Sequence, residues 1–467
     1  MSAEKASTTA SPVTLRRTLG LWDLILYGVI VIQPVAPMSV FGVLSDRGHG
    51  HVVTTILIAM VAMLFTAISY GRMARAYPSA GSAFTYVGQE INPALGYVTG
   101  WSMVMDYLLN PIICTVWCSQ WAHVSAPGVP YWAWAVFFAL VFTILNVQGV
   151  KTSARVNTAL AIGMGVVIAI FFVSAARYIF GNPHDSAGFF TRPFYDPQLW
   201  NLRAVLGGTS IAVLTYIGFD GISTLSEEVE NPRRNILLAT VLTCLVIGIL
   251  SAFEVYAAQL VWPASQPFPN VDTAFTFVAQ RAWPPLFVIL GFTLLVANFG
   301  SGMGAQLGAA RLLYGMGRSN ALPKSFFGVV DKKHRVPRNN VLFVGGLALA
   351  VALLVTVPFE RQTVCNGTVF CYGLGAEMLN FGALIAFMGV NAAAFIRYFV
   401  REKHYTVWNF VPPVAGFLIC LLLWLNLSTP AKIAGAIWMA VGIAVGAWKT
   451  KGFRGNLINF ELPPENE

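Results

Sequence analysis

The chain has 467 residues, of which 56% are hydrophobic and only 10% charged, and its mean hydropathy is +0.66. This composition excludes a soluble enzyme of such length and predicts a protein that resides in a lipid bilayer. The net charge of +9 does not indicate a nucleic-acid partner, because the basic residues fall between apolar segments rather than on one exposed face.

Twelve apolar segments are long enough to cross a membrane when the sequence is read in a window of roughly 20 residues. We therefore predict an all-α membrane protein with twelve transmembrane helices. The predicted spans lie near 22–45, 52–71, 95–122, 131–148, 155–178, 204–229, 236–262, 285–311, 340–358, 374–399, 408–427 and 432–448.

The distribution of Lys and Arg predicts the orientation. With the N-terminus inside the cell, 22 of the 29 basic residues fall on the cytoplasmic side. Both termini are therefore expected in the cytoplasm, in a multi-pass protein of the plasma or inner membrane, and no cleaved leader is expected. The basic segment 317–340 is expected to contact anionic lipid headgroups.

The first span contains Pro34 and Pro37 in its interior, next to Gln33. Proline removes a backbone donor and clashes with the preceding turn, so this helix is expected to kink or unwind between Ile32 and Pro37. Backbone groups freed at such a break line a cavity rather than lipid. Ile32, Gln33, Pro34 and Val35 are therefore candidate substrate-binding residues, and a simple proline kink without a ligand is the alternative.

The sixth span is expected to be interrupted at Gly218, beside the acid Asp220. A carboxylate in the middle of a membrane helix needs a partner, so Asp220 should face protein, ion or substrate. Spans one and six each open a block of five spans, as expected of inverted repeats with discontinuous helices. We expect the two breaks to meet at the binding site, with Tyr216, Ile217 and Phe219 beside Gly218 and Asp220.

Several motifs are specific enough for comparison with known families. They are YGRMARAYPSAGSAFTY at 70–86, INPALGYVTGW at 91–101, the block at 216–234, ARLLYGMGRSNALP at 310–323 and LNFGALIAF at 379–387. This set, in this order, resembles the amino acid–polyamine–organocation (APC) superfamily over nearly the whole chain. Within it, MDYLLNP at 105–111 and GFDGISTLSEE at 218–228 are similar to segments of bacterial putrescine importers.

The resemblance implies a five-plus-five inverted repeat of the LeuT type, with helices 1 and 6 broken and two extra helices. It also implies alternating access and uptake of an amine-bearing substrate, usually driven by protons. The expected organisation is a cytoplasmic tail (1–21), a first repeat (22–178), an extracellular loop (179–203), a second repeat (204–400), helices 11 and 12 (401–448) and a cytoplasmic tail (449–467).

Two positions depart from the pattern of amino-acid carriers in the superfamily. Their first helix commonly has a glycine-rich break whose amides hold the substrate carboxylate, whereas this chain has Ile32, Gln33 and Pro34 there. Fewer amides are free, which favours amines without a carboxylate or an amino acid held differently. Many members also carry a lysine on the fifth helix in place of a sodium ion, and the matching position here is Met164.

Five acids lie in or at the edge of apolar spans, where they could bind a cation or carry a proton. Asp23 begins the first helix and is interpreted as a helix cap. Asp106 and Asp220 lie in motifs of the third and sixth helices, and we expect at least one in the substrate pathway, the alternative being a structural hydrogen bond. Glu254 and Glu377 are candidate proton carriers, although a solvated position is the alternative for Glu377.

Aromatic residues beside the acids could contact an ammonium group. Tyr107 and Trp117 lie on the third helix, and Tyr216 and Phe219 flank the sixth-helix break. A desolvated ammonium gains roughly 0.5–2 kcal/mol over such a ring. Tyr107 is therefore included with Asp106 among the substrate-binding candidates.

Other patterns do not support a catalytic or metal centre. Gly300, Gly302 and Gly304 follow no strand, so helix packing is preferred to a nucleotide loop. The six cysteines have no metal-binding spacing, and neither a cofactor nor a structural metal is predicted. Cys365 and Cys371 lie in a loop expected outside the cell, where a disulfide and two free thiols are both open alternatives.

We therefore predict a secondary transporter, not an enzyme, that imports an amine-bearing solute such as putrescine, a polyamine or an amino acid. Protons are the expected coupling ion, with sodium as the alternative. An amino acid transporter or exchanger without polyamine activity, and a non-transporting amino-acid sensor on the same fold, remain open. A cytoplasmic gate is a further hypothesis, formed when the carrier faces outward by pairing with basic loop residues, and its candidates are Glu227, Glu228, Arg233 and Arg234.

Overall fold

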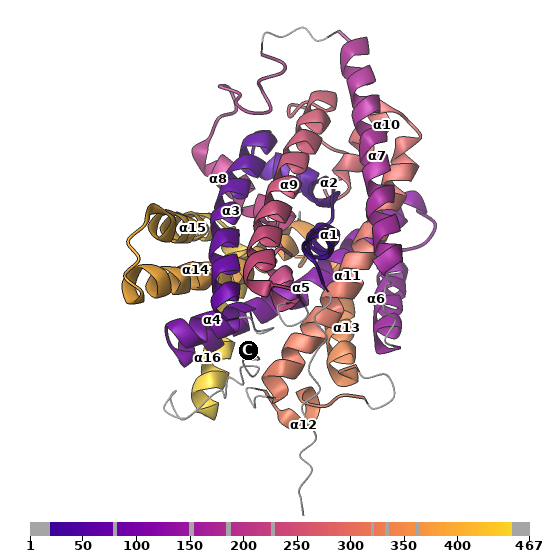
Figure 1. Ribbon diagram of the computed structural model, residues 1–467. Helices are drawn as coiled ribbons and strands as arrows, with labels where there is room; N and C mark the ends of the chain where they lie inside the picture. The colour runs from indigo at the N-terminus through magenta and orange to yellow at the C-terminus, as the bar shows by residue number, and fades with distance from the viewer. Residues whose placement is uncertain are drawn as a thin grey trace, which may run out of the picture.

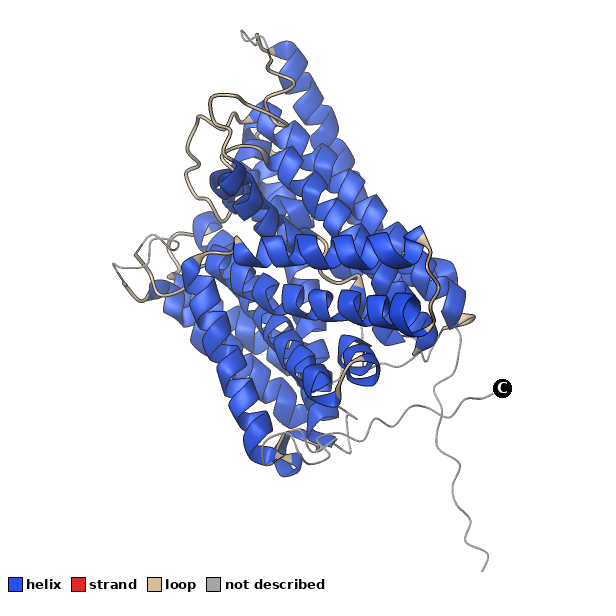
Figure 2. Ribbon diagram, turned by 90° about the vertical axis from the view of Figure 1, so that its left-hand side faces the viewer, coloured by secondary structure: helices blue, strands red, loops and turns tan. Residues whose placement is uncertain are grey.

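The protein is helical throughout the part of the chain that the structure, a computed structural model, describes (Figure 1). The described residues are 19–77, 82–148, 154–183, 188–225, 229–318, 322–331, 336–359, 365 and 367–450. Among them there is no β-strand, only two isolated β-bridges, and every regular element in Figure 2 is a helix. The prediction of an all-α protein is confirmed.

Sixteen α-helices are connected by short turns and by four shorter helical segments. The α-helices are α1 (Leu21–Ile32), α2 (Ala36–Arg47), α3 (Val52–Ala76), α4 (Ser82–Glu90), α5 (Pro93–Ser125), α6 (Tyr131–Val147), α7 (Ala154–Gly181), α8 (Leu202–Ala212), α9 (Pro232–Val261), α10 (Ala274–Ala282), α11 (Leu286–Arg318), α12 (Lys324–Phe327), α13 (Arg338–Leu353), α14 (Tyr372–Phe395), α15 (Val407–Leu425) and α16 (Thr429–Lys449). The segments are 3₁₀-helices η1 (Val213–Thr215), η2 (Asp220–Leu225) and η3 (Leu354–Thr356), and the π-helix η4 (Ile396–Arg401).

Nine helical stretches in the described residues are long and apolar enough to cross a membrane, or ten if α1 and α2 together form one span. The predicted spans near 95–122 and 131–148 coincide with α5 and α6, which are not among them. α6 is apolar but has only 17 residues, and α5 carries polar side chains along its length. A multi-pass membrane protein is therefore confirmed, and the number of twelve spans stays a prediction.

The first apolar segment is divided between α1 and α2. α1 ends at Ile32, α2 begins at Ala36, and the two helices are bent by 43° at the break. Pro34 cannot donate a hydrogen bond to the carbonyl four residues earlier, which ends α1. Pro37 lies in the first turn of α2, where a missing N–H costs little.

The sixth apolar segment loses its α-helical form earlier than expected. The α-helix ends at Ala212, six residues before Gly218, and continues as the short turns η1 and η2. The hydroxyls of Thr209 and Ser210 donate to the carbonyls of Val205 and Leu206, one turn back. Both bonds lie in the last turns of α8, and side-chain bonds of this kind often bend a helix.

α3, α7 and α9 run along the vertical direction of Figure 1, whereas α14 and α15 lie across it at the left. α5 crosses the centre and packs against α4, α6, α11, α13, α14 and α16. α4 and α12 lie in the lower half of Figure 1 and α10 lies near the top. We name these the α4 end and the α10 end.

Candidate functional site

The break between α1 and α2 is held in an unfavourable backbone conformation. Gln33 has φ +71°, which costs a non-glycine residue of order 1–3 kcal/mol and persists only when its surroundings enforce it. The Gln33 side chain provides that constraint, because its Nε2 donates to the carbonyl of Ala297 on α11 at 2.8 Å. Gln33, predicted as a substrate ligand, therefore uses its amide nitrogen to fix the break to α11.

The same break offers hydrogen-bond acceptors rather than donors. The Ala36 amide donates to Gln33 and the Met38 amide to Val35, both at 3.1 Å, and Pro34 and Pro37 have no N–H. Between Gln33 and Met38, only the Val35 amide lacks a backbone acceptor. The carboxyl-terminal carbonyls of α1 also carry a partial negative charge. This break is suited to a cation and poorly suited to a carboxylate.

The second break touches the first through Gly218. Its φ is +123°, a conformation that a residue with a side chain rarely adopts. A Cβ at this position would lie 3.0 Å from Cγ1 of Val31 and 3.1 Å from Cγ1 of Ile32. The Gly218 amide donates to Oδ1 of Asp220 at 3.1 Å, so the acid also stabilises the turn. Glycine is thus required both for the turn and for the contact between the breaks.

Replacing Gly218 with alanine is expected to lower uptake at least about tenfold, because the new methyl group would force the turn away from α1 at a cost of roughly 1–3 kcal/mol. Initial uptake rates in proteoliposomes measure this effect. Gly346 on α13 is the matched control, since a Cβ there meets nothing within 4 Å. Equal uptake rates for both variants would contradict the requirement for glycine at the break.

Asp106 and Asp220 form a pair of buried carboxyl groups near the breaks. Asp106 is 4% exposed and Asp220 2% exposed, and the two lie within electrostatic reach of each other. Oδ2 of Asp220 lies 3.5 Å from the Tyr107 hydroxyl, whereas Asp106 has no hydrogen-bond or ion-pair partner among the described residues. Gly382 of α14 packs directly against α5 at the Asp106 amide. Neither carboxyl group forms an ion pair with Lys, Arg or His in the described part of the chain, so a cationic solute is the group that could hold the pair ionised.

A cavity of about 50 Å³ lies beside the two breaks. This space accommodates a few water molecules, because one water occupies roughly 10–15 Å³ of such volume. Three predicted site residues, Ile32, Gln33 and Ile217, line it. Four polar residues that the sequence analysis missed also line it: Ser39, Asn110, Asn298 and Ser301.

Asn110 connects the cavity to the acid pair. It follows Asp106 by four residues on α5, so both side chains lie on the same helix face. Asn298 of α11 donates to the Ser39 hydroxyl of α2 at 3.1 Å, which links the opposite walls. A solute in the cavity would thus meet neutral amide and hydroxyl groups on one side and carboxyl groups one turn away.

Two of the predicted aromatic ligands pack elsewhere. The Tyr216 hydroxyl donates to the carbonyl of Ile56 on α3 at 2.9 Å. The Phe219 ring packs in a buried cluster, with centroid distances of 5.5 Å to Tyr70 of α3 and 5.4 Å to Phe387 of α14. Neither residue is among those that line the cavity. Both side chains therefore stabilise the sixth-helix break through contacts outside the cavity lining.

The two candidate proton carriers have different surroundings. Glu254 on α9 is fully buried, and neither of its carboxylate oxygens has a hydrogen-bond partner in the described chain. Glu377 is 3% exposed, forms an ion pair with Arg47 at 2.6 Å and accepts from the Ser428 amide. The alternative of a solvated Glu377 is therefore wrong, since it links α2 to α14 and α16 at the α10 end.

Several smaller expectations can be compared with the structure. Asp23 accepts a hydrogen bond from the Gly20 amide at 2.9 Å, which confirms the helix cap. Cys365 and Cys371 form a disulfide, with Cα atoms 5.4 Å apart. Trp117 is buried and donates to the carbonyl of Asp272. Glu227 and Glu228, proposed in an alternative gate, lie outside the described residues.

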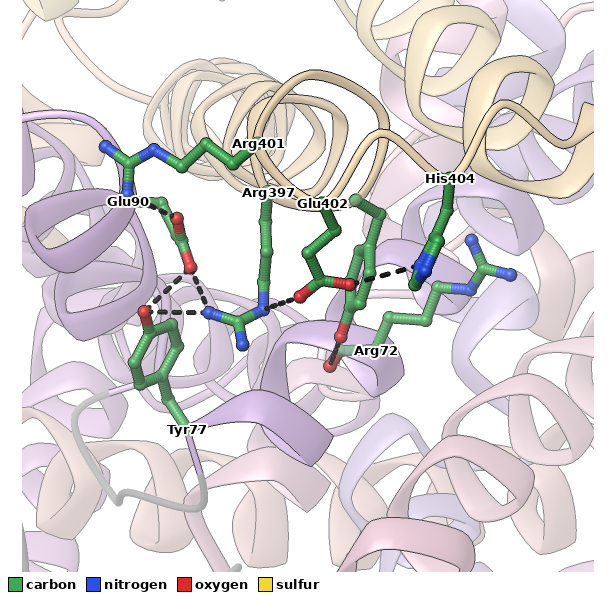
Figure 3. Close-up of polar contacts among 8 residues, drawn as sticks. Arg72, Tyr77, Glu90, Arg397, Arg401, Glu402 and His404 are labelled. Carbon is green, nitrogen blue, oxygen red and sulfur yellow. Dashed lines mark hydrogen bonds and ion pairs between the residues drawn. The ribbon is translucent and has the colours of Figure 1, made fainter.

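A buried acid at the α4 end was not singled out from the sequence. Glu90, 1% exposed, accepts from Arg397, from Arg401 at 2.9 Å and from the Tyr77 hydroxyl at 2.7 Å (Figure 3). We call these four residues the Glu90 cluster. Burial raises the pKa of Tyr77 to about 12, and the bond to Glu90 adds to this, so the Tyr77 hydroxyl retains its proton and donates.

Further contacts extend the cluster along the same surface. Arg397 also pairs with Glu402 at 3.2 Å, and Glu402 with His404 at 3.4 Å (Figure 3). Arg72 of α3 donates to the Asn409 side chain and accepts, through its carbonyl, from Tyr398. Both Arg397 and Arg401 lie on the π-helix η4, a rare form often found at functional positions.

Comparison with known proteins matches this chain to a family of transporters. Residues 37–444 match the family described as amino acid permease. The low-affinity putrescine importer PlaP of Escherichia coli (strain K12) is 33% identical over 98% of this chain and 99% of its own length. The branched-chain amino acid permease BcaP of Bacillus subtilis (strain 168) is 24% identical, with 94% of each chain covered. The methylthioribose transporter of the same organism is 25% identical, with 95% of each covered.

Proposed function

The chain belongs to the amino acid permease family, and on this basis we propose that it is a secondary active transporter that imports an amine-bearing solute by alternating access. Its relatives are permeases and importers, so the protein is a transporter rather than an enzyme. The solutes named for these relatives differ, because putrescine has no carboxylate and an amino acid has one. The residues of the binding site must therefore determine which kind of solute this chain accepts.

The proposed topology has twelve spans with both termini in the cytoplasm. α1 with α2 forms the first crossing and α8 with η2 the sixth, each opening one five-helix repeat. In the described part of the chain, Arg397 and Arg401 pair with Glu90 at the α4 end, and basic residues there support placing that end in the cytoplasm. The α10 end, with the ion pair of Arg47 and Glu377, then faces outward.

We propose a diamine or longer polyamine, rather than an amino acid, as the solute. The observation that carries this is the combination of an acceptor-rich first break with the unneutralised pair Asp106 and Asp220. Ammonium groups would bind the carboxylates and the carbonyls at the end of α1. An α-carboxylate would meet only the Val35 amide there, and it would also lie near two acids.

Matched solute pairs test this choice. Ornithine differs from putrescine, and lysine from cadaverine, by one carboxylate. Putrescine is expected to be favoured over ornithine about 100-fold in kcat/KM, because an unpaired carboxylate beside like charge costs roughly 2–5 kcal/mol. Uptake of labelled solutes into proteoliposomes under an inward proton gradient measures the ratio. Equal kcat/KM for each pair would instead support the amino acid transporter alternative.

Proton coupling is part of the proposal, with Glu254 as the carrier. Where the resemblance to amino-acid carriers implies a lysine on the fifth helix, this chain has Met164, which cannot carry charge. Glu254 is a buried carboxyl group without a partner, and an ionised form in that position would cost about 3 kcal/mol or more. It is therefore protonated when enclosed and can release the proton when the carrier opens. Sodium is the alternative coupling ion.

A further inference from the structure

α4 lies beneath the sixth-helix break at the α4 end. It is wedged between α5 and α14: a Cβ at Gly96 would lie 2.6 Å from the Cα of Gly88, and a Cβ at Gly389 would lie 3.0 Å from Cγ2 of Val87. Its first residue, Ser82, makes a hydroxyl–hydroxyl hydrogen bond of 3.0 Å with Ser223 of η2. α4 thus connects the central helices with the segment that carries Asp220.

A ring of buried side chains closes the space around this contact. Tyr70 of α3 packs edge-on against Tyr86 of α4 at 6.2 Å and against Phe219 of the break at 5.5 Å. Phe387 of α14 completes the ring at 5.4 Å from Phe219. These aromatic side chains are at most 1% exposed. In this conformation the route from Asp220 to the α4 end is shut.

The two ends of α4 are held with different strength. Ser82 makes a hydrogen bond with Ser223 of η2 in which both groups are neutral hydroxyls. Glu90, at the other end, receives bonds from two guanidinium groups and a phenol, and charge-assisted bonds are roughly twice as strong as neutral ones. The contact of α4 with η2 is therefore weaker than the contact of α4 with η4. We expect the contact with η2 to separate when the site opens toward the α4 end.

We propose that Glu90 is a positioning residue of an inner gate, resting on the proposed function of alternating access. Through its bonds to η4 it holds α4 still, so that Ser82 and Tyr86 form a fixed seat with Tyr70 and Phe387. Phe219 and Ser223 move away from this seat each time solute leaves toward the cytoplasm. Because Ser223 also donates to the Asp220 carbonyl at 2.6 Å, the gate is connected directly to the acid that binds the solute.

A disulfide staple tests whether the seat and η2 separate. In the double variant Ser82→Cys/Ser223→Cys, oxidation is expected to cross-link the two positions, to abolish putrescine uptake and to leave putrescine binding from the outer side intact. Reduction restores uptake. The single variants and the wild-type protein, treated identically, control for the native Cys365–Cys371 disulfide and for the buried free cysteines.

The outcomes distinguish this proposal from the proposed function. A cross-linked protein that still transports at the normal rate, or a double variant that cannot be cross-linked, would overturn the inner gate. A wild-type protein that neither binds nor transports any amine would instead overturn the proposed function, whatever the behaviour of the staple.

A second measurement isolates Glu90. In the background Ser223→Cys, the substitution Glu90→Gln is expected to raise the labelling rate by a membrane-impermeant thiol reagent, applied to inside-out vesicles, about tenfold, since the seat is no longer held. Glu402→Gln is the matched control, because Glu402 pairs with Arg397 but forms no hydrogen bond or ion pair with Glu90 in the described structure. Glu90→Asp should partly restore protection. Labelling that is equal in the Glu90→Gln and Glu402→Gln variants would limit Glu90 to a structural role.

Discussion

Replacing Asp106 with asparagine is expected to lower kcat/KM for putrescine at least about 100-fold while leaving the folded protein as stable as before or more stable. Removing the carboxylate from a buried carboxylate–ammonium pair costs roughly 2–5 kcal/mol of binding, and each 1.4 kcal/mol is a factor of ten. The stability should not fall, because the Asp106 carboxyl has no partner in the described structure and its removal breaks no bond. Proteoliposome uptake and thermal unfolding in detergent measure the two effects.

Asp23 provides the matched control for this substitution. Asp23 is likewise a carboxyl group in an apolar segment, but it caps the start of α1 by accepting from Gly20, nine residues or about 13 Å before that helix ends at Ile32. Asp23→Asn should therefore change kcat/KM by less than about threefold and should lower stability by a few tenths to about 1 kcal/mol. Loss of uptake in both variants, or a large loss of stability in Asp106→Asn, would mean that Asp106 is structural.

Asp220 combines two tasks that Asp106 does not. Its Oδ1 accepts from Gly218, its carbonyl accepts from Ser223, and its Oδ2 lies near Tyr107. The structural hydrogen bond that was one alternative for Asp220 is therefore present, and its place in the substrate pathway stays a prediction. Asp106 is the cleaner test of solute binding because only charge is lost.

The sequence predicted those features of the fold that depend on local chemistry. Pro34 and Pro37 located the first break to within a few residues, because a missing N–H acts wherever the rest of the chain lies. The end of α8 at Ala212 was not predicted, since neither a proline nor a glycine occurs between Ala212 and Gly218 to mark it in the sequence.

Candidate site residues could be predicted where an acid lies in an apolar span, but neutral polar residues of the cavity could not. Asp106 and Glu254 are conspicuous because acids are rare in apolar spans. Asn110 and Asn298 are neutral, and which face of α5 or α11 meets the cavity depends on how the helices pack. Glu90 and Arg397 lie 307 positions apart in the chain, so their pairing could not be read from spacing.

Glu254 is predicted to carry the coupling proton, and it shares its helix face with other buried polar groups. Ser251 and Thr243 precede it by three and eleven residues on the same face of α9, and their hydroxyls, like its carboxylate, are buried without hydrogen-bond partners in the described chain. In such surroundings a carboxyl group that binds and releases a proton is more favourable than one that stays ionised. This face adjoins α1 near Gly28, where Thr243 meets the helix.

Glu254→Gln should abolish gradient-driven accumulation of putrescine, at least about 100-fold below wild type, while exchange of internal for external putrescine continues. Glutamine has the shape of the protonated acid but cannot release a proton, so the solute crosses without an ion to drive it uphill. Glu377→Gln is the control, because Glu377 is fixed by Arg47 and its loss should lower stability but preserve accumulation. If accumulation by Glu254→Gln kept the magnitude and pH dependence of wild type, the proton would have to be carried elsewhere. If accumulation instead required sodium in the wild-type protein, the buried acid would be a sodium ligand, because a carboxylate without a protein partner can be neutralised by either cation.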